Sequence, residues 1–158
     1  MPDISLEQGK LIVAEAKTWK GTPYMLVGGN SEKGVKGDCS GTTFKIYQAA
    51  GFPYEYQMTV NFPDYAVKSG KFRKMEPADP KQEGDVLWWP GHMAIYTSFA
   101  DDSANATTPR VNKSGQPYKQ MNDMWTASNP NGGPPYGPGK IEYFRKDKPT
   151  LYRYQVSN

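Results

Sequence analysis

The polar and apolar positions near the N-terminus repeat with helical spacing. Ser5 and Gln8 match the capping-box pattern, in which two side chains satisfy backbone N–H groups at the start of a helix. The spacing predicts a helix from Ser5 to about Lys20, where Gly21-Thr-Pro23 would end it. We expect one face of this helix to be buried through its apolar residues, which are Ile12, Ala16 and Trp19.

Apolar residues also recur at helical spacing over residues 39–50, which predicts a second helix with Gly51 just past its end. The recurring residues are Phe44, Tyr47 and Ala50. A short helix is predicted over residues 60–69. The segments 24–36 and 77–84 are rich in turn-forming residues and are expected to be loops.

After Gly84 the pattern changes to short apolar runs of the kind that form strands. The predicted strands are residues 85–89, 92–97, 103–108, 141–144 and 151–156. Pro90-Gly91 would form the turn between the first two strands. The Pro/Gly-rich segment 129–139 is expected to be irregular, and its role is open.

Helices precede strands along the chain, and this order predicts an α+β fold with a mainly antiparallel sheet. The chain has 158 residues, a length that suits one hydrophobic core. We therefore expect residues 1–158 to form a single domain.

The composition narrows the kinds of site that the chain can hold. It contains one cysteine and one histidine, which excludes an internal disulfide and a multi-cysteine zinc site. We expect no metal and no cofactor. The formal net charge is +3, and the excess arises after residue 132, where five basic residues face two acidic ones.

That basic C-terminal segment has two interpretations. It is either a solvated pair of strands or a surface for an anionic partner. Three excess charges are few for a nucleic-acid-binding surface, so we expect no nucleic-acid partner. No apolar run approaches the ~20 residues that cross a bilayer, and membrane insertion is not expected. The first residues lack the features of a signal peptide, so we expect synthesis in the cytoplasm and export by another route.

The single cysteine lies in Gly37-Asp-Cys-Ser-Gly41, where a loop becomes a helix. Asp38 or Ser40 can cap that helix, which places Cys39 in its first turn. Backbone N–H groups and the helix dipole there favour a thiolate. The alternative is that Cys39 is a small buried apolar residue, as most single cysteines are.

The single histidine, His92, begins the predicted strand after Pro90-Gly91. Taken alone it is a surface or core histidine, but together with Cys39 it forms a minimal pair of nucleophile and base. A third polar group should fix the imidazole tautomer. Asn105 on the next predicted strand is the first candidate, and Ser103, which has the same parity, is the second.

Five short motifs occur in an order that resembles the NlpC/P60-type cell-wall cysteine peptidases. They are Gly21-Thr-Pro-Tyr24, Gly28-Gly29, Asp38-Cys-Ser-Gly41, Gly84-Asp-Val86 and Gly91-His-Met-Ala-Ile-Tyr96. Each motif is weak, but the ordered set is specific. The resemblance covers residues 5–108, while residues 109–158 form a divergent loop followed by C-terminal strands.

The resemblance implies a papain-like fold with the nucleophile at a helix N-terminus packed on the sheet. It implies that Cys39 is the nucleophile, His92 the base and Asn105 the orienting residue, although many members have a second histidine at that third position. Tyr24, Asp38, Ser40 and Gly91 are the candidates for binding substrate or the oxyanion. For Tyr24 the alternative is an aromatic residue at the edge of the core.

The expected function is cysteine-dependent hydrolysis of an amide bond in peptidoglycan stem peptides. A stand-alone domain of this kind resembles type VI secretion amidase effectors, which act in the periplasm of a target bacterium and are blocked by an immunity protein. The alternatives are a phage or prophage lysin, a housekeeping wall endopeptidase, and an acyltransferase or non-hydrolytic wall-peptide binder on the same scaffold.

Overall fold

The computed structural model describes residues 2–98, 100, 122–127 and 135–156. Their helices are α1 (Leu6–Thr18), η1 (Gly28–Asn30), α2 (Cys39–Ala50), α3 (Phe62–Lys68) and α4 (Ile141–Phe144). The strands are β1 (Phe72–Lys74), β2 (Val86–Trp89), β3 (His92–Tyr96), β4 (Met124–Thr126), β5 (Gly137–Gly139) and β6 (Thr150–Tyr154). All pairings between these strands are antiparallel, in the order β1-β6-β2-β3-β4-β5. The expected α+β fold is confirmed.

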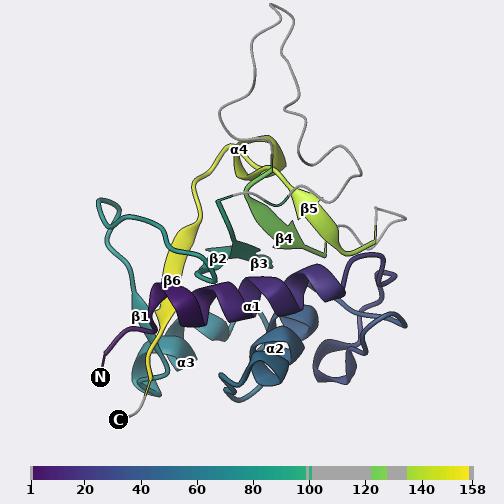
Figure 1. Ribbon diagram of the computed structural model, residues 1–158, viewed down its shortest axis with the longest axis horizontal. Coiled ribbons are helices and arrows are strands. Elements are labelled where there is room, and N and C mark those ends of the chain that lie inside the picture. Colours follow the sequence, from purple (N-terminus) through teal and green to yellow (C-terminus); the bar gives the residue numbers. More distant parts are fainter. Residues whose placement is uncertain (1, 99, 101–121, 128–134, 157–158) are drawn as a thin grey trace, which may run out of the picture.

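The sheet has an apolar core on each face. On one face, the helices α1, α2 and α3 cover the sheet, as Figure 1 shows, and the larger core lies between them. On the other face, α4 covers a smaller cluster that includes Leu87 and Trp89. Side chains of β2 alternate between the two clusters, because Val86 and Trp88 face the helical layer.

The two long helices begin and end where the sequence predicts. Ser5 and Gln8 form the complete capping box of α1. The apolar face of α1 is buried, with Ile12 and Ala16 fully inaccessible. Gly51 ends α2 in the left-handed conformation at φ 98°, which glycine adopts without steric cost.

The hairpin of β2 and β3 is also where it was expected. Trp89 pairs with His92, so Pro90 and Gly91 are the two central residues of the turn. Gly91 has φ 81°, and proline followed by such a glycine is typical of a type II turn. This short turn fixes His92 at the first position of β3.

Two predictions near the C-terminus are wrong. Residues 141–144 form the short helix α4 and not a strand, because a helical turn brings Ile141 and Phe144 together against the smaller core. Residues 137–139 of the supposedly irregular segment form β5 beside β4. A Cβ on Gly139 would lie 3.1 Å from the Met124 side chain, so a residue without one fits this close pairing.

The Gly84-Asp-Val86 motif has a structural role. Asp85 is fully buried and accepts two hydrogen bonds of 2.9 Å from the Arg153 guanidinium on β6. Arg153 Nη1 also lies 3.8 Å from Asp3 near the N-terminus. The terminal segments pair with each other, as Ile4 donates to the Tyr154 carbonyl, and both chain ends lie beside β1 and β6 (Figure 1).

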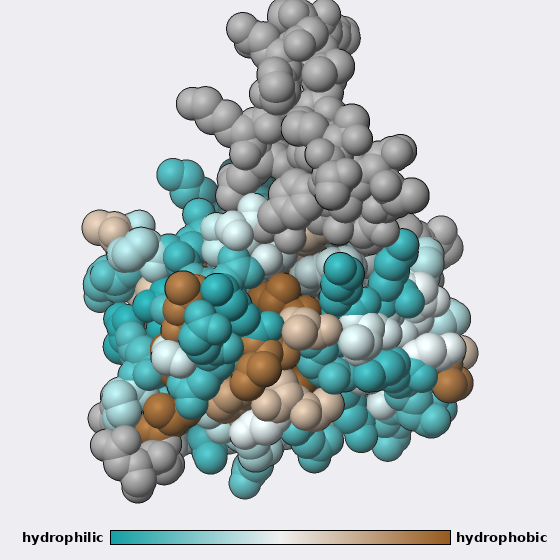
Figure 2. All heavy atoms as spheres, in the orientation of Figure 1, coloured by the Kyte–Doolittle hydropathy of each residue, from teal (hydrophilic) through white to brown (hydrophobic). Residues whose placement is uncertain are grey.

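The outer surface of α1 is partly apolar. Figure 2 shows apolar side chains among polar ones on the face that carries α1, where Leu6 and Leu11 are about half exposed. Among the helices of the described residues, none has the length and apolar character needed to cross a bilayer.

Candidate active site

Cys39 is the first residue of α2, and its side chain is buried against β3. The backbone N–H groups of Met93, Ser40 and Cys39 itself lie close enough to the thiol to lower its pKa. Met93 directly follows His92, so the sulfur lies against the beginning of β3. The fold therefore brings the only cysteine and the strand that carries the only histidine together.

The protonation state of Cys39 differs from the expectation. Burial is the largest influence and raises the pKa of the thiol, while the surrounding N–H groups only partly oppose it. The charge of Asp38 raises the pKa further. The resting side chain is a thiol, and a thiolate would have to form with the help of a base.

Asp38 connects the start of α2 to the preceding loop. It is the N-cap of the helix, accepting a hydrogen bond of 2.7 Å from the Gly41 N–H. Its second carboxylate oxygen accepts another of 2.7 Å from the Gly28 N–H in η1. Because both oxygens are occupied and the side chain is buried, Asp38 holds the Gly28-Gly29 segment beside Cys39.

Gly41 lies where that loop approaches the helix most closely. A Cβ at this position would be 2.0 Å from the Gly28 carbonyl oxygen and 2.1 Å from Ser31 Oγ. We expect Gly41→Ala to destabilise the protein by about 2 kcal/mol or more, because backbone must move to relieve the overlap. Urea denaturation measures the effect, with Gln48→Ala on the exposed side of the same helix as control. A Gly41→Ala protein as stable as the control would contradict this packing.

Two tyrosines lie beside Cys39. Burial, followed by the nearby Cys39 and Asp38, raises the pKa of Tyr24 to about 12, so its hydroxyl stays protonated and able to donate. No sequence motif pointed to Tyr56, whose hydroxyl is 2.8 Å from Ser40 Oγ. Ser40 is buried, and its hydroxyl forms hydrogen bonds with the Tyr56 hydroxyl and with the Asp38 carboxylate. A Cβ on Gly28 would meet the Tyr56 hydroxyl at 2.8 Å, which explains the glycine.

The His92 ring is held on three sides. Its Nε2 lies 2.7 Å from the Thr126 hydroxyl on β4. Its ring centroid is 4.3 Å from that of Phe144 in α4 and 5.7 Å from that of Trp89. Among the described residues Nε2 is the only bonded ring nitrogen, and no hydrogen bond joins the imidazole to the Cys39 thiol. Catalytic hydrogen bonds often form only when substrate is bound.

Burial and, to a lesser extent, the positive charge of Arg145 together lower the pKa of His92 to about 4. The imidazole is therefore neutral at neutral pH. A neutral ring is able to accept a proton.

This low pKa predicts a loss of stability in mild acid. The unfolded chain binds the histidine proton near pH 6.5 and the folded chain only near pH 4, so the free energy of unfolding falls as pH drops through that window. The full loss is about 3 kcal/mol. Denaturant unfolding from pH 7 to pH 4 measures it. His92→Gln should lack this contribution, and parallel pH curves for the two proteins would contradict the assignment.

The remaining predicted residues have different outcomes. Gly91 lies in the turn directly before His92. The described residues do not include Asn105, Ser103 or the strand predicted over 103–108. The role of Asn105 or Ser103 in orienting His92 therefore stays a prediction. β3 pairs with β2 on one side and with β4 on the other, and β4 supplies Thr126. Because β4 is short and lies far from His92 along the chain, no local sequence signal pointed to Thr126.

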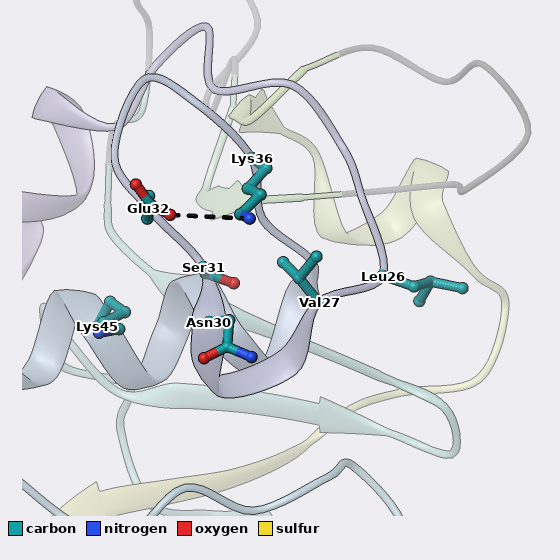
Figure 3. Close-up of a pocket in the computed structure, with 7 residues that line it drawn as sticks. All are labelled: Leu26, Val27, Asn30, Ser31, Glu32, Lys36 and Lys45. Carbon is teal, nitrogen blue, oxygen red and sulfur yellow. Dashed lines mark ion pairs between the residues drawn. The ribbon is translucent and has the colours of Figure 1, made fainter.

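A cavity of about 660 Å³ lies beside the loop that precedes α2. Figure 3 shows it between η1, the loop at Glu32 and Lys36, and Lys45 of α2. Neither Cys39 nor His92 lines it, so the chemistry and this cavity are separate. Within the described ranges, no three His, Cys, Asp or Glu side chains lie together in a way that could hold a metal ion.

Neither a family model nor a curated protein matches this chain. Among solved structures it is similar to a Staphylococcus aureus protein described as similar to a lipoprotein of the NLP/P60 family. The TM-score is 0.60 at 20% identity, over 99% of this chain and 44% of that one. The chain thus spans less than half of its structural neighbour. At this identity the likeness concerns the fold: the chain has the α+β, papain-like fold of an NLP/P60-family protein, with Cys39 where a helix begins against an antiparallel sheet.

Proposed function

We propose that the protein is a cysteine-dependent hydrolase of an amide bond in bacterial peptidoglycan stem peptides. The observation that carries this proposal is that the Cys39 sulfur is buried at the start of α2, close to the backbone of Met93, the residue that follows His92. The fold of an NLP/P60-family protein and the ordered motifs support the substrate class.

The first half of the reaction begins with two neutral groups. The proposed reaction uses the tautomer in which Nε2 of His92 carries the hydrogen and donates it to the Thr126 hydroxyl, so that Nδ1 has a free electron pair. Nδ1 takes the thiol proton while Sγ forms a bond to the carbonyl carbon. The resulting oxyanion is stabilised by N–H groups at the start of α2, and the protonated Tyr24 hydroxyl is a further donor.

The second half releases the two products. Imidazolium at His92 gives its proton to the leaving nitrogen, and the carbon–nitrogen bond breaks to leave a thioester on Cys39. A water molecule then attacks the thioester carbon while His92 accepts the water proton. The carbon–sulfur bond breaks, and the returning proton restores the thiol.

Thr126 is proposed as the residue that positions His92. Thr126→Val should lower kcat by about tenfold to a hundredfold, because the ring loses the partner that fixes its tautomer. Thr126→Ser keeps the hydroxyl and should restore most of the rate. Steady-state kinetics on a stem peptide measure both variants. Equal rates for Thr126→Val and Thr126→Ser would assign the orienting role to another residue, such as Asn105.

Purified peptidoglycan tests the function itself. The enzyme should release free amino groups from it, iodoacetamide should stop the release by alkylating Cys39, and a chelator should have no effect. Unchanged release after complete alkylation would contradict the cysteine mechanism.

We further propose that the hydrolase acts as an antibacterial effector in the periplasm of a target cell, with an immunity protein as its partner. Directed to the periplasm of a Gram-negative host by an added signal peptide, it should cause lysis that depends on Cys39. Co-expression of a periplasmic protein from a neighbouring gene should suppress this lysis. Absence of toxicity in cells whose isolated wall the enzyme digests would favour a lysin or a housekeeping endopeptidase.

A further inference from the structure

The chain segment that follows β5 packs beside His92. Phe144 of α4 stacks on the imidazole, with the two ring planes inclined by 32°. The next residue, Arg145, donates a hydrogen bond of 2.8 Å from Nη1 to the Pro90 carbonyl, in the turn that leads into His92. Two neighbouring residues thus bind both the catalytic ring and the turn that positions it.

The Arg145 guanidinium has N–H groups beside His92 that are available to a further hydrogen-bond acceptor. A guanidinium has five N–H donors. Among the described residues it uses one on the Pro90 carbonyl, and its Nε lies 3.3 Å from Asp147 Oδ1. The Arg145 side chain is 36% exposed and that of Asp147 is 53% exposed, so this ion pair is a weak surface contact. An anion can therefore engage the rest of the guanidinium.

The position of Arg145 defines which part of a substrate would meet it. In the proposed reaction, which this inference takes as its basis, His92 delivers a proton to the leaving nitrogen. The residue that carries this nitrogen must then lie against His92, and so beside Arg145. A planar guanidinium suits a carboxylate better than any other group of a peptide.

We infer that Arg145 binds a free carboxylate on the residue that leaves with the amine. The substrate class is then a stem peptide in which the leaving diaminopimelate keeps its carboxylate, in preference to one in which that group is amidated. Both candidate bonds, γ-D-glutamyl–diaminopimelate and D-alanyl–diaminopimelate, release this residue.

Binding of the carboxylate would also help the chemistry. The charge of Arg145 opposes protonation of His92 and contributes to its low pKa. A carboxylate on Arg145 offsets that charge, so the imidazolium that forms during attack is less disfavoured. The correct substrate would thereby activate its own base, whereas a carboxamide would leave the opposing charge in place.

Two synthetic stem peptides test the inference, identical except that the D-centre of the leaving diaminopimelate bears a carboxylate in one and a carboxamide in the other. The natural enzyme should prefer the carboxylate by about tenfold to a hundredfold in kcat/KM. Arg145→Gln should remove this preference, because kcat/KM should fall much further on the carboxylate peptide than on the carboxamide peptide. Lys146→Gln, which changes the adjacent exposed cation, should retain it.

The other outcomes separate the inference from the proposed function. A preference that survives in Arg145→Gln, or an equal loss on both peptides, would overturn the inference and make Arg145 a structural tie to Pro90. If Arg145→Gln does not fold, Arg145→Lys keeps the charge without the planar fork and should show a reduced preference; an unchanged preference would overturn the inference. Failure of the natural enzyme to cleave either peptide through Cys39 would overturn the proposed function as well.

Discussion

Replacing Cys39 with alanine is expected to abolish hydrolysis, with a loss of about 10⁴-fold or more in kcat, because no other side chain at the site can form the thioester. The fold should survive. Alanine is a good helix former, and the Asp38 cap that holds the start of α2 does not involve the thiol. Stem-peptide cleavage measures the rate, and thermal unfolding reports the fold.

Cys39→Ser provides the matched variant for this experiment. It retains a nucleophilic atom of similar size, but a hydroxyl is far less acidic than a thiol, and it too should be inactive. A folded Cys39→Ala protein that cleaves at the natural rate would end the cysteine mechanism, whatever the other variants do.

His92→Ala should have the second largest effect, lowering kcat by about 10²-fold to 10⁴-fold. Burial keeps Cys39 protonated, so the reaction depends on a base more strongly than it would with a preformed thiolate. Loss of His92 therefore removes both thiol deprotonation and protonation of the leaving amine. Single-turnover kinetics should show slow acylation.

The loss of activity in His92→Ala could arise from lost packing and not from the lost base, and a control variant separates the two causes. His92 is buried beside Phe144, so its removal leaves a small cavity that also costs stability. Phe144→Leu disturbs the same packing without removing the base. It should keep much more activity than His92→Ala, and equal losses would show that packing, not proton transfer, accounts for the histidine effect.

Local sequence signals predicted the elements that position Cys39 and His92. The capping box of α1, the Asp38 cap of α2 and the Pro90-Gly91 turn each depend on residues a few positions apart. Such signals are independent of the rest of the fold, which is why Cys39 and His92 were placed at the ends of their elements.

The rest of the site depends on contacts between distant segments. Thr126 and Phe144 reach His92 only because β4 pairs with β3 and α4 packs on the opposite face of the sheet from α2. The protonation state of Cys39 was also missed, because a helix N-terminus favours a thiolate while burial, which the sequence does not display, opposes it more strongly. Long-range packing decides these features.

Hydrolysis of a stem-peptide amide is best tested by mass spectrometry of muropeptides after digestion of purified peptidoglycan in water enriched in the heavy oxygen isotope. Hydrolysis should give new stem fragments whose fresh carboxyl group carries one heavy oxygen, accompanied by fragments with a free diaminopimelate amine. Both should be absent with Cys39→Ala. Cleavage without heavy oxygen in the product, transfer to an added amine instead of water, or an unchanged muropeptide profile from the folded natural enzyme would contradict hydrolysis of a stem-peptide amide.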